Sequence, residues 1–348
     1  MRERGQGGEG QETLDSGGEE IISLDEFQPS RLELKVESYK PVTMLAVLRS
    51  MLYVPGNNAR LVQKARGFTA DVIVLDLEDS VPFTEKEAAR ALVRDSIATV
   101  RESGADVYVR VNAWGTGLTD GDLEALVRPG LDAVVLPKTE TPDDVRRLDR
   151  KLDELERRVG LAFGVVAAQL IIETAKGVLN AYQCAVASRR VNALCFGAVD
   201  YSRDMRVQLT RDGWEVFHAR SQVGMVARAA GLVAIDSAWP AYADAEGFVK
   251  DTKAGAQLGY EGRVLIHPNQ IEPAHAIYSP SNAEVEQARE VVAAFEAGLD
   301  RGVASVPLRG SMVDWPVYRS AKEVLAKADL TAQKERTKQE RRGATAQP

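Results

Sequence analysis

Eight short apolar runs, each followed by a helix-like segment, constrain the fold of this 348-residue chain most strongly. The runs are apolar almost without interruption, as expected of parallel strands that are buried on both faces. They lie at residues 50–54, 72–77, 107–111, 133–136, 165–172, 193–196, 232–235 and 263–266. The helix-like segments between them include 84–103, 141–159, 175–188, 216–230 and 242–258. Because parallel strands need such crossovers, the pattern predicts repeated strand–helix units.

Eight units over about 220 residues are close to the size of a TIM barrel, which is about 250 residues. A doubly wound sheet more often has about five or six strands and a glycine-rich first turn. We therefore predict a (β/α)8 barrel over residues 49–280 and a C-terminal helical extension over 281–330. Residues 1–20 and 331–348 are polar and lack an apolar face, so we predict disordered tails there. Residues 21–48 are amphipathic and are predicted to form an N-terminal extension.

The composition excludes several classes of function. The formal net charge of −7, without a basic cluster, gives no electrostatic footprint for nucleic acid, and the apolar runs are too short to span a membrane. The first 20 residues lack the apolar stretch of a secretory signal and contain acids that a mitochondrial presequence avoids. Cys184 and Cys195 lack metal-ligand spacing and are expected to be reduced core residues. We predict a cytoplasmic protein that binds neither nucleic acid nor membrane.

Polar and charged residues follow the predicted strands at their carboxyl ends, which in a TIM barrel all open on the face that carries the chemistry. These residues are Asn57, Asp76, Glu78, Asp79, Arg110, Asn112, Lys138, Glu173, Asp200, Asp236 and His267. Carboxylates dominate this rim, and they repel one another unless a cation lies between them. Oxygen ligands with few histidines suit Mg²⁺ or Mn²⁺ better than Zn²⁺. The sequence therefore predicts a site for a hard divalent cation.

Eight blocks of residues stand in order along residues 49–328. They are RSMLYVPGNNARLVQKA (49–65), ADVIVLDLEDSV (70–81), VRVN (109–112), LPK (136–138), ETAKGVLNA (173–181), FGAVDY (196–201), GYEGRVLIHPNQI (259–271) and GSMVDWP (310–316). Together they resemble the citrate lyase beta-chain-like CoA-ester lyases, which include malyl-CoA and citramalyl-CoA lyases. The resemblance implies a barrel of the phosphoenolpyruvate/pyruvate type that binds a CoA thioester and a small 2-oxo acid.

Carried over by position, the resemblance implies that Glu173 and Asp200 coordinate Mg²⁺, with Mn²⁺ as a possible substitute. The alternative for Glu173 is an N-cap or first-turn acid of the helix that begins near Thr174, and the alternative for Asp200 is a loop acid that binds backbone amides. Arg110 is implied to face the oxygen of the 2-oxo acid, where charge develops during carbon–carbon cleavage. Its alternative is a salt bridge to Glu78 or Asp79 at the barrel mouth.

The resemblance also implies a role for Asp314 as the acid or base that exchanges a proton with the acyl-CoA enolate. In relatives a neighbouring subunit supplies this aspartate, which implies a homotrimer or hexamer. The alternative is that Asp314 caps the helix that begins at Trp315.

The remaining candidates form two groups. The first contains residues expected to contact substrate or to orient the metal ligands and Arg110, namely Asp76, Glu78, Asp79 and Lys138. Lys138 has an alternative role as a Schiff-base lysine. The second contains cations proposed to bind the CoA phosphates, namely Arg49, Arg60 and Lys64, which are alternatively solvated surface charges. After Asp200 the chain departs from the usual block of the family, and the variant loop over 205–214 leaves the substrate open.

The predicted function is Mg²⁺-dependent cleavage or formation of a 3-hydroxyacyl-CoA thioester such as malyl-CoA or citramalyl-CoA. Other enzymatic possibilities are a citrate lyase beta subunit with partner chains, a malate synthase or thioesterase variant, and a class II 2-oxo acid aldolase that needs no CoA. A barrel retained as a non-catalytic scaffold is a further possibility, which loss of metal binding would favour.

Overall fold

A closed barrel of eight parallel strands forms the centre of the structure, a computed structural model that describes residues 47–345. The strands are β1 (Ser50–Pro55), β2 (Val72–Asp76), β3 (Asp106–Arg110), β4 (Ala133–Leu136), β5 (Ala167–Ile172), β6 (Val191–Phe196), β7 (Val233–Asp236) and β8 (Gly262–Leu265). The barrel closes where Met51 of β1 pairs with Val264 of β8. Each predicted run overlaps one of these strands, so the TIM barrel prediction is confirmed. The predictions for 1–20 and for nearly all of 21–48 lie outside the described residues.

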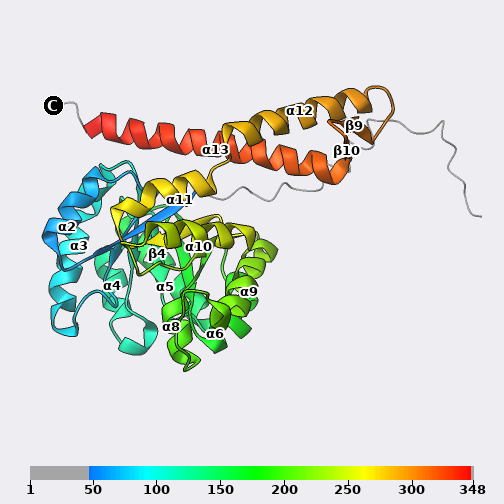
Figure 1. Ribbon diagram of the computed structural model, residues 1–348. Coiled ribbons are helices and arrows are strands. Elements are labelled where there is room, and N and C mark those ends of the chain that lie inside the picture. The colour runs from blue at the N-terminus through cyan, green and yellow to red at the C-terminus, as the bar shows by residue number, and fades with distance from the viewer. Residues whose placement is uncertain (1–46, 346–348) are drawn as a thin grey trace, which may run out of the picture. The chain divides into compact units, whose positions relative to one another are not determined.

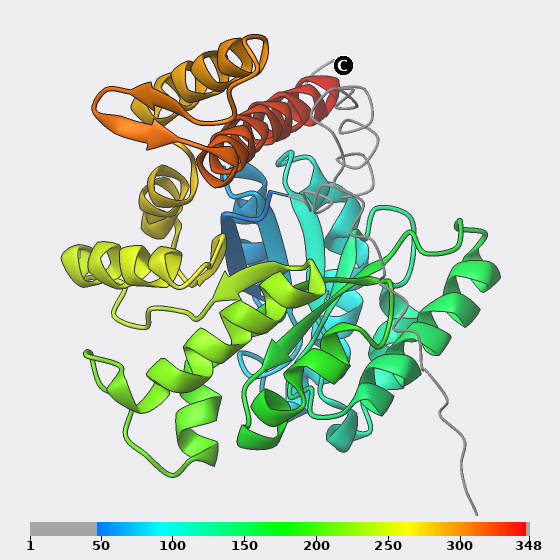
Figure 2. The ribbon, with the colours of Figure 1, turned by 90° about the vertical axis from the view of Figure 1, so that its right-hand side faces the viewer.

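Helices follow the strands and surround the barrel (Figure 1 and Figure 2). They are α2 (Ala59–Lys64), α3 (Lys86–Arg101), α4 (Thr119–Leu126), α5 (Pro142–Val159), α6 (Ala175–Leu179), α7 (Ala181–Ala185), α8 (Ala198–Asp204), α9 (Trp214–Ala230), α10 (Ala245–Gln257) and α11 (Ile271–Tyr278). The helix predicted over 175–188 is divided at Asn180, which ends α6 and begins α7. The Asn180 side-chain amide donates to the Glu140 carbonyl at 2.9 Å, so a tertiary contact accompanies the break.

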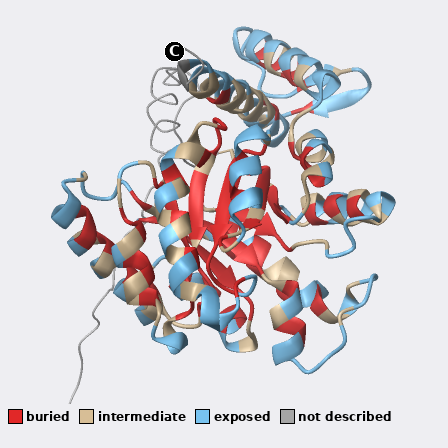
Figure 3. Cartoon of the chain, turned by 90° about the vertical axis from the view of Figure 1, so that its left-hand side faces the viewer, coloured by how far each residue is buried: buried red, intermediate tan, exposed pale blue. Residues whose placement is uncertain are grey.

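Strand side chains alternate between two apolar layers, which together contain most of the buried residues (Figure 3). Outward side chains pack against the helices, and inward side chains fill the barrel. The inward residues include Met51, Val74, Tyr108, Val135, Ile171, Ala193, Ile235 and Val264. The same alternation turns inward the side chains two residues further on, at Asp76, Arg110 and Glu173. These three polar groups therefore lie at the carboxyl end of the barrel interior.

The C-terminal extension consists of α12 (Asn282–Leu299), a hairpin of β9 (Val306–Leu308) and β10 (Ser311–Val313), and α13 (Trp315–Thr345). Its own apolar core centres on Phe295, whose ring lies 5.0 Å from that of Trp315 and 4.8 Å from that of Tyr318. No helix within residues 47–345 has both the length and the apolar character of a membrane span.

The final part of α13 crosses the amino ends of the barrel strands and corrects the prediction of a disordered tail over residues 331–345, whereas 346–348 lie outside the described residues. The buried Lys338 ammonium donates to the Thr69 carbonyl at 2.7 Å, and Lys334 forms a 2.6 Å ion pair with Asp106. A Cβ on Gly104 would lie 2.3 Å from the Lys338 carbonyl oxygen, so the helix approaches this turn closely. The segment has no apolar face because polar and ionic contacts hold it.

Candidate active site

Arg110 is fixed by two carboxylates at the carboxyl end of the barrel. Its Nε and Nη2 donate to the two Asp76 oxygens at 2.6 and 2.8 Å, and its Nη1 lies 2.9 Å from Glu78 Oε2. Although burial raises the pKa of Asp76, the Arg110 guanidinium outweighs burial and lowers that pKa below its usual value. Asp76 also accepts hydrogen bonds from the backbone and side chain of Ser80. Asp76 is therefore an orienting residue, and two of the five N–H donors of Arg110 are used for its carboxylate, while Nη1 forms an ion pair with Glu78.

Lys138 connects Glu78 to Glu173. Its ammonium forms an ion pair with Glu78, and its backbone N–H donates to Glu173 Oε1 at 2.7 Å. Its φ of 49° is in the left-handed region, which costs a non-glycine residue about 1–3 kcal/mol. Burial lowers the pKa of Lys138, but the bond and charge of Glu78 outweigh it and raise that pKa. The amine is thus held protonated, which disfavours the Schiff-base alternative, because a Schiff base needs a neutral amine.

Glu173 is buried without a cationic partner. Glu173 is 3% exposed, and its carboxylate forms no ion pair within residues 47–345. Burial, followed by the charges of Glu78 and Asp200, raises the pKa of Glu173 to about 8. A Cβ on Gly197 would lie 2.6 Å from both Cβ and Oε2 of Glu173, so only glycine leaves room for this carboxylate. A buried acid with this surplus of negative charge fits a hard divalent cation.

Asp200 lies on the first turn of α8, and its charge acts on Glu173. Its Oδ1 accepts a 2.8 Å hydrogen bond from Arg203, and its side chain is 20% exposed. The N-cap or first-turn alternative is wrong for Glu173, because Thr174 is the N-cap of α6 and Glu173 precedes it. The loop alternative is wrong for Asp200, which lies within α8 and accepts its hydrogen bond from Arg203. Glu173 and Asp200 therefore remain the candidate pair of oxygen ligands. Asp79, by contrast, is half exposed and lies 3.6 Å from the Lys138 ammonium.

The prediction that Arg49 binds CoA phosphates at this rim is wrong. Arg49 precedes β1, so it lies at the amino end of the barrel, where its guanidinium is buried against Asp71 at 2.8 Å. Burial raises the pKa of Asp71, but Arg49 outweighs it and lowers that pKa to about 2. Arg60 and Lys64 instead lie on α2 and line a surface hollow of about 480 Å³. Their proposed role in CoA binding stays a prediction.

Asp314 is not at this rim in its own chain. Its Oδ1 accepts a hydrogen bond from the Val317 N–H at 3.2 Å, as an N-cap of α13 does. The extension that contains it lies on the side of the barrel opposite to α6 and α8 (Figure 1 and Figure 2). The capping alternative is thus observed, and a role at the rim requires a second copy of the chain.

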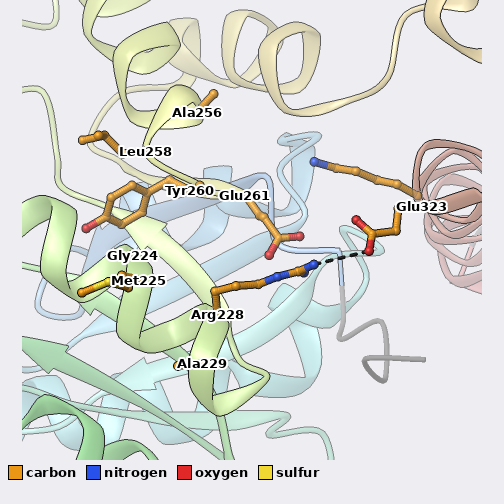
Figure 4. A pocket seen from close by; sticks show the side chains of 11 residues that line it. Gly224, Met225, Arg228, Ala229, Ala256, Leu258, Tyr260, Glu261 and Glu323 are labelled. Atoms are coloured by element: carbon orange, nitrogen blue, oxygen red, sulfur yellow. Dashed lines mark hydrogen bonds and ion pairs between the residues drawn. The ribbon is translucent and has the colours of Figure 1, made fainter. Parts of the chain in front are cut away.

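Two other features of the described part of the chain lie away from the rim. One is a cleft of about 620 Å³ between α9, the segment before β8, and α13, bridged by the 3.4 Å ion pair of Arg228 and Glu323 (Figure 4). The other is a cluster of Asp71, His275 and Glu335, whose ligand atoms lie within 4.8 Å of one another. Because Arg49 and Lys338 pair with Asp71 and Glu335, this cluster is already neutralised by protein cations.

Three contributors to the site were not assigned a role from sequence. Ser80 completes the hydrogen bonds of Asp76, and Gly197 makes room for Glu173. The ring of Tyr53 lies under Arg110, with its centroid 5.2 Å from the guanidinium carbon. Alternation along β1 predicts that Tyr53 points inward, but nothing in the sequence indicates the other two contacts.

The chain is similar to known proteins over most of its length. The model of the HpcH/HpaI aldolase/citrate lyase family matches residues 49–268. The citrate lyase subunit beta of Leuconostoc mesenteroides subsp. cremoris is 37% identical over 281 residues, 81% of this chain and 93% of that protein. A (3S)-malyl-CoA thioesterase of Cereibacter sphaeroides is 34% identical, over 82% and 95% of the two chains. The structure of CitE from Mycobacterium tuberculosis, in complex with magnesium, acetoacetate and coenzyme A, is 30% identical, covers 82% and 99%, and superposes with a TM-score of 0.63.

Proposed function

The chain belongs to the HpcH/HpaI aldolase/citrate lyase family, and we propose that it is a Mg²⁺-dependent carbon–carbon lyase acting on a 3-hydroxyacyl-CoA thioester. In the cleavage direction the products are a 2-oxo acid and an acyl-CoA. The observation that carries the proposal is the buried Glu173 carboxylate, which forms no ion pair within residues 47–345 and lies at the same end of the barrel interior as Arg110. The structure of the related CitE is a complex with magnesium, acetoacetate and coenzyme A.

Glu173 and Asp200 are the residues that would hold the cation. When bound, Mg²⁺ would supply a Lewis acid that lowers the pKa of the substrate hydroxyl, and Mn²⁺ is a chemically similar substitute. The Lys138 N–H and Gly197 keep the Glu173 carboxylate in place, which is how neighbouring groups commonly orient a ligand.

Arg110 stabilises the negative charge that develops on the oxygen of the future 2-oxo acid. Two of its N–H groups donate to Asp76, and its Nη1 forms an ion pair with Glu78, which together fix the plane of the guanidinium. The N–H groups that do not donate to Asp76 would bind the substrate oxygen. Because the fork is held before substrate arrives, little reorganisation is needed as the carbon–carbon bond breaks.

Asp314 of a second copy would complete the reaction. The substrate hydroxyl loses its proton, the carbon–carbon bond breaks, and the acyl-CoA leaves as an enolate that takes a proton from Asp314. Condensation is the reverse, with Asp314 removing that proton. This role rests on the resemblance of GSMVDWP to the family block and implies a homo-oligomer, with a trimer or hexamer expected.

The acyl group of the substrate and the fate of the thioester distinguish the variants of this proposal. Malyl-CoA and citramalyl-CoA are the proposed substrates, but the similarity to citrate lyase beta subunits supports a citryl thioester delivered by partner chains. The similarity to a malyl-CoA thioesterase supports hydrolysis after condensation. The cytoplasmic location predicted from sequence stays part of this proposal.

The test is to incubate the purified protein with malyl-CoA and citramalyl-CoA in the presence of Mg²⁺. Release of glyoxylate or pyruvate that stops with EDTA and in Asp200→Ala would support the lyase. Free CoA without a 2-oxo acid would instead support the thioesterase, and turnover of free 2-oxo acids alone would support the aldolase. A suitable control is Glu154→Gln, an exposed acid on α5 outside both the rim and the extension that contains Asp314, which should keep full activity.

A further inference from the structure

The two acids of the proposed metal site differ in how their charge is balanced. Glu173 is buried without an ion pair among the described residues, whereas Asp200 is paired within its own helix. The Arg203 Nη2 donates to Asp200 Oδ1 at 2.8 Å, one turn further along α8. Side chains of a helix lean toward its N-terminus, and α8 begins at the barrel mouth, so the Arg203 guanidinium is directed back toward the rim.

We propose that Arg203 competes with the divalent cation for the Asp200 carboxylate and thereby sets the metal affinity of the site. The inference rests on the proposed function, because it takes Asp200 as a metal ligand. A carboxylate oxygen held by a guanidinium must lose that hydrogen bond before it can coordinate an ion in the same direction. The free energy of the pair is therefore subtracted from that of metal binding.

The exposure of the pair limits the size of the effect. The Arg203 side chain is 75% exposed, so water readily solvates the guanidinium when Asp200 releases it. Exposed ion pairs stabilise a protein weakly, and the measured range corresponds to about a 1.5- to 5-fold change in an equilibrium constant. The competition should thus weaken metal binding by a few-fold without abolishing it.

The nearby Arg206 allows the pair to be separated from a general charge effect. Arg206 follows α8 and is exposed, and no ion pair or side-chain hydrogen bond of its guanidinium is found within residues 47–345. Removing it takes away one positive charge near the rim but no partner of Asp200. Arg289 on α12 supplies a second control. It forms an exposed ion pair at 2.6 Å with Glu286, three residues before it, as Arg203 does with Asp200, but far from the site.

The experiment is a Mn²⁺ titration of the full-length chain, followed through the EPR signal of free Mn²⁺. Arg203→Ala should lower the Kd of Mn²⁺ by about 1.5- to 5-fold, and Arg203→Lys should give an intermediate value. Arg206→Ala and Arg289→Ala should keep the Kd of the unmodified protein. Thermal unfolding of each variant checks that it is folded.

Three results would overturn the inference. An unchanged Kd for Mn²⁺ in Arg203→Ala would show that Arg203 does not compete with the cation for the Asp200 carboxylate. An equal decrease in Arg206→Ala would assign the effect to the general field of the rim rather than to the pair. Absence of Mn²⁺ binding in the unmodified protein would remove the metal site itself and with it the metal-dependent lyase, so this failure is distinguishable from the other two.

Discussion

Metal binding should release a proton from Glu173 at neutral pH. Burial and the charges of Glu78 and Asp200 raise the pKa of Glu173 to about 8, so the carboxyl is mostly protonated at pH 7 in the metal-free protein. A metal ligand must be deprotonated, so the ion displaces that proton. From a pKa of about 8, the expected release is about 0.9 proton at pH 7, about 0.5 at pH 8 and about 0.1 at pH 9.

The sign of the pH dependence follows from the same shift. Below pH 8 the ion competes with the proton, so the apparent affinity should rise about tenfold per pH unit and level off above pH 8. Isothermal titration calorimetry with Mg²⁺ measures both quantities, because repeating the titration at one pH in buffers of different ionisation enthalpy gives the number of protons released.

The matched variants are Glu173→Gln, which is neutral at every pH, and Glu290→Gln, a distant exposed acid on α12. Any affinity that Glu173→Gln retains should be free of this proton release, and Glu290→Gln should behave as the unmodified protein. A release of less than about 0.2 proton at pH 7, with an affinity that does not change between pH 6 and 9, would refute the raised pKa and the assignment of Glu173 as a ligand.

Three further substitutions test the geometry around the site and the barrel base. Asp76→Asn should lower kcat/KM by about 100-fold or more, because Arg110 loses its bidentate partner. The free energy of unfolding, measured by urea denaturation, should fall by about 3 kcal/mol. A change below twofold in kcat/KM would contradict the orienting role. Gly197→Ala should weaken Mn²⁺ binding, measured by EPR, by at least about tenfold, since the added methyl group overlaps the Glu173 side chain. Unchanged binding would show that the Glu173 carboxylate can move aside. Lys338→Met should lower the free energy of unfolding by about 1–3 kcal/mol, because it removes the buried ammonium from the base of the barrel. Arg336→Met, at an exposed position, should change it little. Equal changes in the two variants would argue against a stabilising contact between Lys338 and the Thr69 carbonyl.

The barrel and the rim were predictable because both follow from local patterns. Buried parallel strands read as continuous apolar runs, and residues two positions past an inward side chain must also point inward. Asp76, Arg110 and Glu173 were predicted at the rim because each stands at the carboxyl end of such a run, and the alternation seen in the structure turns their side chains inward. Arg49 was misplaced because its position just before β1, rather than after it, puts it at the opposite end of the barrel. The tail prediction failed at Lys334 and Lys338, whose contacts are polar and leave no periodic apolar signal.

The sequence by itself determined the (β/α)8 order, the face that carries the acids, and the kinds of residue gathered there, because each depends only on spacing along the chain. The tertiary structure alone decided which contacts these residues make. Both Asp76 oxygens accept from Arg110, Lys138 is held protonated by Glu78, and Glu173 is buried without an ion pair within residues 47–345. Such partnerships join residues from different strands, at distances that no sequence interval encodes. The balance of charge, on which the chemistry of the site depends, is therefore a property of the folded barrel.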